Sequence, residues 1–229
     1  MIAVLVGACL QGSVGFGFGL VAAPVLALVD PTLVPTVIIA MSVPLTCLVA
    51  WRERDALDLR RVGWAVLGRT LGTVAGLVAV LYLSERWLAA VFAFALLFAV
   101  AISAVGRTVA PTKPALFIAG GASGAMGTAT SVGGPPMALL LQHETGPQLR
   151  ASLSAFMAFG VTLSLVALAA VGEFDRHKVQ VALGLAPLVV VGFVLSKWTT
   201  RIADRGYTRP LVLTFAAVSA ISILIREVI

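Results

Sequence analysis

Long apolar runs follow one another along the whole chain, and this pattern constrains the fold more than any other feature of the sequence. A helix that crosses a bilayer needs about 20 consecutive apolar residues. Only 11% of the 229 residues are charged, whereas a soluble domain has about 25%. We therefore predict an all-α polytopic membrane protein that lies in the lipid bilayer. Its eight apolar segments are expected at 2–29, 33–51, 62–83, 87–105, 115–142, 149–171, 178–198 and 210–226.

A glycine-rich stretch occurs twice. The first copy runs from Gln11 to Gly19 and the second from Ser123 to Ser131, each followed by a proline. Moving the first copy by 112 positions places Gly12 on Gly124 and Gly15 on Gly127. The two host segments, 2–29 and 115–142, are also longer than a simple crossing requires. Glycine weakens a helix by about 1 kcal/mol relative to alanine, so each host segment is predicted to be broken at its centre. The expected half-helices are 2–11 with 19–29, and 115–123 with 134–142.

A second similarity extends the repeat. The basic stretch 58–62 before the third segment is similar to the stretch 175–179 before the seventh. Together with the glycine stretches, this predicts two four-segment repeats, at 1–107 and 113–229. Internal repeats of this kind are common in secondary transporters.

The basic residues between the segments test how the repeats are oriented. If all eight segments cross the membrane, nine basic residues face one side and six the other. If the first and fifth segments dip in and return, the division becomes eleven to four, which fits the positive-inside rule better. The larger group is then Arg52, Arg54, Arg60, Arg61, Arg107, Lys113, Arg150, Lys197, Arg201, Arg205 and Arg209; the smaller is Arg86, Arg176, Lys178 and Arg226. We therefore expect inverted repeats whose re-entrant glycine tips meet near the membrane midplane.

Broken helices at membrane depth survive only where the backbone is buried in protein or lines a cavity. A half-helix that begins there presents free N–H groups and a partial positive charge, which suit an anion. The alternative interpretation is that the glycines are only close-packing surfaces between helices. The candidate substrate-binding residues are Gln11, Gly12, Ser13, Gly15, Gly17, Gly19, Arg69, Gly124, Gly127, Thr128, Thr130, Ser131 and Gly133.

Arg69 is the one charge clearly inside a segment, and no Asp or Glu lies in a segment interior. It shares a helical face with Gly72, Thr73 and Gly76, which is the face expected to pack inward. An inward arginine without a carboxylate is a candidate for binding an anion. The alternative is that it reaches the interface or caps backbone carbonyls.

Other chemistry is not indicated. The sequence has no nucleophile–base pair, and Cys9 and Cys47 lack metal-ligand spacing, so we expect no enzyme, no metal and no cofactor. His143, Glu144 and His177 are expected in solvated loops. The basic residues set membrane orientation and do not indicate nucleic acid. A glycine stripe at 68, 72 and 76 predicts close internal helix packing, with a homodimer seam as the alternative.

Two motifs carry a family resemblance. They are Gly12-x-x-Gly15-x-Gly17-x-Gly19 with Pro24, and Gly124-x-x-Gly127 with Gly133-Gly134-Pro135-Pro136. With the paired four-segment repeats, they resemble the sulfite exporter TauE/SafE family of bacterial membrane proteins. The resemblance implies export of sulfur-containing anions such as sulfite, sulfonates or sulfoacetate across the inner membrane. At 128–131 the chain has Thr-Ala-Thr-Ser where glycines are usual, and we expect this half to set selectivity.

The sequence thus predicts a multi-pass secondary transporter that moves a small anion, an oxidised-sulfur species or an organic acid, by alternating access. A passive anion channel and a membrane scaffold that transports nothing are the alternatives.

Overall fold

The computed structural model describes residues 1–82 and 109–207, together with positions 210, 214, 217, 218 and 221. This part of the chain is helical and contains no strand, as predicted for an all-α protein. The predicted segment 87–105 and most of 210–226 lie outside the described residues. The helices are α1 (Ile2–Val14), α2 (Phe18–Val29), α3 (Thr36–Arg52), α4 (Leu59–Tyr82), α6 (Lys113–Thr130), α7 (Gly134–Leu141), α8 (Gly146–Ala170) and α9 (Arg176–Ile202). Short helical turns are Pro31–Leu33, Arg54–Ala56 and Ala203–Tyr207.

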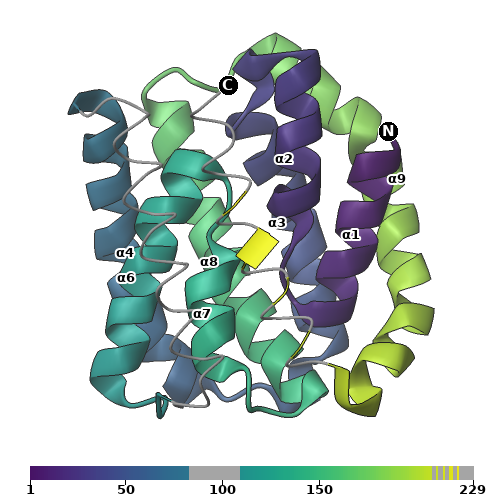
Figure 1. The fold of residues 1–229 in the computed structure, drawn as a ribbon. Coiled ribbons are helices and arrows are strands. Elements are labelled where there is room, and N and C mark those ends of the chain that lie inside the picture. Colours follow the sequence, from purple (N-terminus) through teal and green to yellow (C-terminus); the bar gives the residue numbers. More distant parts are fainter. Residues whose placement is uncertain (83–108, 208–209, 211–213, 215–216, 219–220, 222–229) are drawn as a thin grey trace.

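The first broken segment forms the hairpin of α1 and α2. Gly15 and Gly17 have φ angles of 95° and 118°, a region that side chains other than glycine rarely enter. The chain reverses there, and α2 packs back on α1 with Phe18 beside Gly7. The start of α1 and the end of α2 consequently lie at the same end of the molecule (Figure 1). The break is shorter than predicted, because α1 continues to Val14 instead of ending near residue 11.

The second broken segment forms the hairpin of α6 and α7, and it turns at Ser131, which has a φ of 60°. The predicted end of its first half at residue 123 is wrong, because α6 continues to Thr130. Packing of α6 along α4 accounts for this difference, since tertiary contacts contribute more to helix stability than intrinsic propensity does.

The glycine stripe on α4 is the seam of this packing. A Cβ atom at Gly76 would lie 2.7 Å from the carbonyl oxygen of Ala125 on α6. Gly68 and Gly72 meet α6 in the same way, at Phe117 and Gly121. The partner positions rise together along both helices, so α4 and α6 run parallel, and the predicted internal packing is confirmed.

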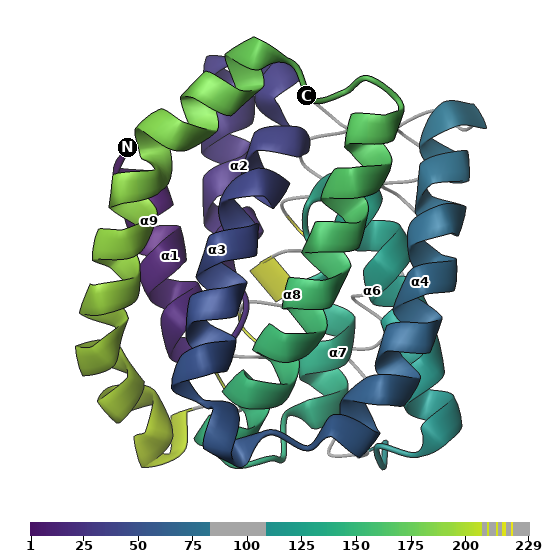
Figure 2. The same cartoon turned by 180° about the vertical axis from the view of Figure 1, so that it is seen from behind.

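Two apolar cores lie on either side of the α3–α8 contact. One core is built by α1, α2, α3 and α9, and the other mainly by α4, α6, α7 and α8. Figure 2 shows α1 and α9 on one side of this contact, and α4 and α6 on the other. Each hairpin therefore belongs to a different core.

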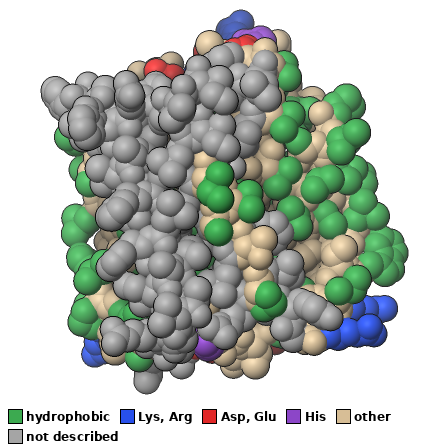
Figure 3. All heavy atoms as spheres, viewed as in Figure 1, with side chains coloured by type: hydrophobic (Ala, Val, Ile, Leu, Met, Phe, Trp, Pro, Cys, Tyr) green, Lys and Arg blue, Asp and Glu red, His purple; other side chains and the backbone are tan. Residues whose placement is uncertain are grey.

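The outer surface is largely apolar. Leu183, Val166 and Trp198 expose 68%, 61% and 60% of their surface, and charged side chains gather at the two ends (Figure 3). Among the described residues, Gly146–Ala170 and Arg176–Arg205 are long and apolar enough to cross a membrane, and three shorter helical stretches are also apolar. Such a surface suits a lipid environment.

Candidate functional site

A cavity lies where the tips of the two hairpins meet. Phe16 from the first tip packs against Gly134 at the start of α7, and Gly19 lies against the carbonyl of Ser131. The cavity volume is about 20 Å³, close to the minimum of about 10–15 Å³ that holds one water molecule. Its lining residues are Gln11, Phe16, Gly17, Gly19, Leu20, Ile39, Ser42, Arg69, Gly127, Ser131, Val132, Gly133, Gly134, Pro135, Met157 and Val161.

The cavity brings together part of the predicted site. The predicted residues that line it are Gln11, Gly17, Gly19, Arg69, Gly127, Ser131 and Gly133. They come from both glycine stretches and from α4. Binding of a substrate by these residues stays a prediction. Sequence reasoning did not single out Ser42 on α3, which lines the cavity and whose hydroxyl donates to the carbonyl of Ile38 at 2.8 Å.

Three predicted residues near the first break face other helices. Ser13 donates to the carbonyl of Cys9 at 2.6 Å and contacts the hydroxyl of Thr199 on α9 at 2.5 Å. Gly12 packs against Ser196 of α9, and Gly15 packs against Arg150 of α8. These residues hold the first tip against its neighbours and do not line the cavity.

Three predicted residues near the second break are also occupied by the protein itself. Gly124 packs against Arg69 and Thr73 of α4, which agrees with the packing interpretation. Thr130 donates to the carbonyl of Met126 within its own helix at 2.8 Å. The hydroxyl of Thr128 lies 3.0 Å from that of Ser164 on α8. None of the three lines the cavity.

Arg69 is buried in the protein, with 1% of its surface exposed. Its Nη1 donates to the carbonyl and the hydroxyl of Ser123 at 2.7 and 2.9 Å, and Nη2 donates to Ser164 at 3.5 Å. The guanidinium carbon lies 5.7 Å from the ring centre of Phe156. Arg69 therefore points inward and does not reach the membrane interface, and it also caps one backbone carbonyl.

Three glycines make room for this guanidinium. A Cβ atom at Gly127 would lie 2.8 Å from Nη2, and one at Gly133 would lie 2.7 Å from Nη1. A Cβ at Gly160 of α8 would collide with Nε and the guanidinium carbon. The absence of side chains at these positions allows a full positive charge to sit beside the cavity. Within the described part of the chain, the ion pairs do not include Arg69.

Three residues that line the cavity carry a buried polar atom without a hydrogen-bond partner. The atoms are Nε2 of Gln11, Nε of Arg69 and Oγ of Ser131. The other amide atom of Gln11 accepts from the backbone N–H of Phe18 at 3.2 Å, which leaves Nε2 as a free donor. An unsatisfied buried polar group costs about 1–3 kcal/mol. All three atoms can donate, so each of them would be satisfied by a hydrogen-bond acceptor.

The two half-helix starts contribute unequally. The first N–H of α2, at Phe18, is taken by Gln11. In α7, Pro135 and Pro136 follow Gly134, and proline has no N–H to offer. The start of α7 therefore has fewer N–H groups to offer than the start of an ordinary helix. Side-chain donors take a larger part in this cavity than the sequence indicated.

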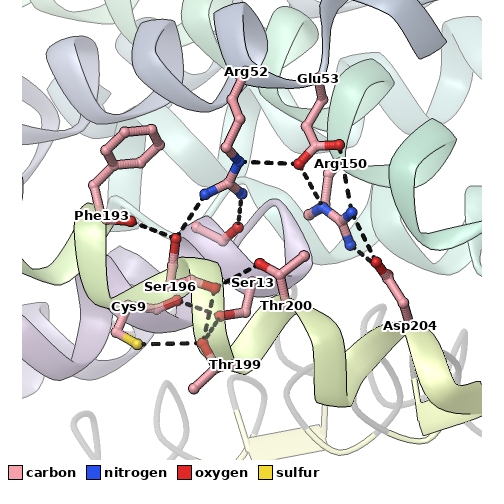
Figure 4. A network of polar contacts seen from close by, with 11 residues as sticks. Cys9, Ser13, Arg52, Glu53, Arg150, Phe193, Ser196, Thr199, Thr200 and Asp204 are labelled. Atoms are coloured by element: carbon pink, nitrogen blue, oxygen red, sulfur yellow. Dashed lines mark hydrogen bonds and ion pairs between the residues drawn. The ribbon is translucent and has the colours of Figure 1, made fainter.

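A polar network closes one end of the molecule beside the first tip (Figure 4). Glu53, after α3, accepts from Nε of Arg52 at 3.0 Å and from Nε of Arg150 on α8 at 3.1 Å. Arg150, which is 3% exposed, also donates to Asp204 at 2.6 Å. We call these four residues the charge lock.

The charge lock also holds the first tip directly. Nη2 of Arg52 donates to the carbonyl of Gly12, and Nη1 donates to Ser196 on α9 at 2.8 Å. Sequence analysis treated Arg52 and Arg150 only as orientation charges. Glu53 and Arg150 are 97 positions apart, and no local pattern indicates such a pair.

The apolar surface, the helical fold and the buried polar cavity define an integral membrane protein of the helical class. Residues 1–223 match the family model described as sulfite exporter TauE/SafE. The chain therefore belongs to the sulfite exporter TauE/SafE family, and the resemblance drawn from its glycine motifs is confirmed. This family implies a membrane transporter of sulfur-containing anions and not an enzyme. Neither the curated proteins nor the solved structures that were searched contain a match to the chain.

Proposed function

We propose that the protein is a secondary transporter that exports a small sulfur-containing anion, such as sulfite or a short sulfonate, through the cavity between the hairpin tips. The observation that carries this proposal is the set of three unsatisfied donor groups around the cavity, on Gln11, Arg69 and Ser131. Sulfite and sulfonate oxygens are hydrogen-bond acceptors, which is what these donors lack, and the closed cavity of about 20 Å³ has to widen to admit such an anion. The positive charge of Arg69 adds the electrostatic attraction that an anion requires.

The two hairpins support an arrangement of inverted repeats, 1–107 and 113–229. The hairpin of α1 and α2 opens toward one end of the molecule, and that of α6 and α7 opens toward the opposite end. The basic end is the end where α3 finishes and α4, α6 and α8 begin. The described basic residues at or near it are Arg52, Arg54, Lys113, Arg150, Lys197, Arg201 and Arg205, whereas Arg176 and Lys178 lie at the opposite end.

Seven basic residues against two support placing the basic end in the cytoplasm, by the positive-inside rule. The protein is accordingly a multi-pass protein of the bacterial inner membrane. The proposed repeats resemble those of secondary transporters in which two halves rock around a central site.

Alternating access is supported by the closure of the cavity. Its volume of about 20 Å³ is too small for an open pore, and the charge lock ties α3, α8 and the end of α9 together at the basic end. Opening this end requires the lock to separate. This observation favours a carrier over a passive channel.

The proposal is tested by sulfite counterflow in proteoliposomes. Wild-type protein is expected to exchange external labelled sulfite for internal sulfite, and Arg69→Gln is expected to lose most of this flux. Arg54→Gln is the matched control, because Arg54 is an exposed arginine at the basic end, with 56% of its side chain exposed, and its flux should equal that of wild type. Flux that never saturates would support the channel. If the protein neither binds nor transports any sulfur anion, the result would support the scaffold.

A further inference from the structure

We propose that the cavity selects its substrate by valence and takes a singly charged oxyanion in preference to a doubly charged one of the same size. This inference rests on the proposed function and specifies the substrate class of the same site. For sulfite, the transported species is then hydrogensulfite. The inference depends on how much positive charge the site contains.

Among the described residues that line the cavity, Arg69 supplies the whole formal charge. The other lining residues are uncharged, and the nearest groups that face the guanidinium are Ser123, Gly127, Phe156, Gly160 and Ser164. None of them titrates near neutral pH. The charge lock is internally balanced, because its two arginines are matched by Glu53 and Asp204.

The sequence extends this charge count beyond the described residues. The stretches 87–105 and 210–225, which lie within the predicted segments 87–105 and 210–226, contain no Asp, Glu, Lys or Arg. These two stretches therefore bring no second formal charge to the site.

Helix dipoles do not add a second net charge. A helix start carries about half a positive elementary charge, and a helix end carries about half a negative one. Each hairpin tip brings one helix end and one helix start together. At the first tip α1 ends at Val14 beside the start of α2, and at the second α6 ends at Thr130 beside the start of α7. The partial charges at each tip oppose one another.

A monoanion at this site forms a neutral pair with Arg69, whereas a dianion leaves one uncompensated negative charge in the protein interior. Uncompensated buried charge is strongly unfavourable, because the interior replaces little of the hydration that the ion loses. Hydrogensulfite has the favourable charge and carries its own proton. Its movement therefore requires no intramembrane carboxylate, which agrees with the lack of Asp and Glu in the segment interiors.

Three tetrahedral sulfur compounds of similar size test the inference. Dimethyl sulfone is neutral, methanesulfonate is singly charged and sulfate is doubly charged at neutral pH. Their binding to purified full-length protein in nanodiscs is measured by calorimetry at equal ionic strength. Wild-type protein should bind methanesulfonate about tenfold or more tightly than either of the other two. Arg69→Lys should keep this order, since the charge is retained.

Arg69→Gln removes the positive charge, so the preferred ligand should change from the singly charged to the neutral compound. Dimethyl sulfone should then bind at least as well as methanesulfonate. Sulfate binding equal to or tighter than methanesulfonate in wild type would overturn the valence inference and leave the proposed anion site standing. A retained preference for methanesulfonate in Arg69→Gln would also overturn it. Failure of wild-type protein to bind any of the three compounds or sulfite would overturn the proposed function together with it.

Discussion

Neutralising Glu53 should open the basic end of the protein. In wild type this carboxylate lies between two arginines, at 3.0 Å from Arg52 and 3.1 Å from Arg150. In Glu53→Gln, Asp204 is the remaining carboxylate of the charge lock. The two guanidinium groups then repel each other across a site whose side chains are only 3–19% exposed.

The magnitude follows from the burial of the lock. Removing one partner of a buried ion pair costs about 3–5 kcal/mol, and we take about 3 kcal/mol because Glu53 and Arg52 retain some exposure. Separation of the arginines on opening relieves this energy. Since about 1.4 kcal/mol corresponds to a tenfold change, the ratio of open to closed protein should rise by up to about a hundredfold.

Thiol labelling measures this change. The chain has two cysteines, at positions 9 and 47, so Cys9→Ser with Cys47→Ser gives a cysteine-free background. Ser42→Cys then places a single thiol on the wall of the cavity. A membrane-impermeant maleimide applied from the basic end should label this thiol much faster when Glu53→Gln is also present.

Glu173→Gln is the matched control. Glu173 pairs with Lys178 at 3.2 Å near the opposite end, but its side chain is 58% exposed. The Lys178 side chain is only 10% exposed, but solvent screens a pair whose carboxylate is this exposed, so the labelling rate at position 42 should hardly change. Equal labelling rates in Glu53→Gln and wild type, with both proteins intact by size-exclusion chromatography, would refute the gating role of the lock.

Two further substitutions probe the helix seam and the cavity. Gly124→Ala should lower the stability by about 1–3 kcal/mol through overpacking, because the new Cβ would lie 2.7 Å from the backbone nitrogen of Thr73. The change is measured as a fall in Tm. Gly184→Ala is the control and should not lower Tm, because a Cβ there has no neighbour within 4 Å. Ser131→Gly keeps the left-handed turn and removes one donor, so sulfite affinity should fall by a factor of about 2–10 while Tm is maintained. Thr130→Val removes a hydroxyl that donates within its own helix and accepts from the backbone N–H of Val132 at 3.3 Å. An equal loss of affinity in this control would contradict the role of Ser131.

The helix breaks could be predicted from the sequence, whereas their extents could not. Glycine density and excess length locate both breaks, because glycine is unfavourable in a helix and long segments do not fit one crossing. The extension of α6 to Thr130 depends on contacts with α4, which are distant in sequence. Local propensity carries no information about such contacts.

In the candidate site, too, some residues could be predicted from the sequence and others could not. Gln11, Arg69 and Ser131 could be selected because polar groups inside apolar segments need a partner. Thr130 could have been set aside at the same stage, since Thr inside a helix commonly bonds the carbonyl four residues earlier. Ser164 and the charge lock could not be selected, because their roles arise from residues brought together from separate helices.

The most direct measurement of the central claim is an experimental structure of the protein saturated with selenite, a sulfite analogue whose selenium atom gives an anomalous signal. The account predicts one selenium peak in the cavity, within hydrogen-bonding distance of Gln11, Arg69 and Ser131, and its disappearance in Arg69→Gln. An empty cavity at saturating selenite, with the anion bound elsewhere or not at all, would contradict the account.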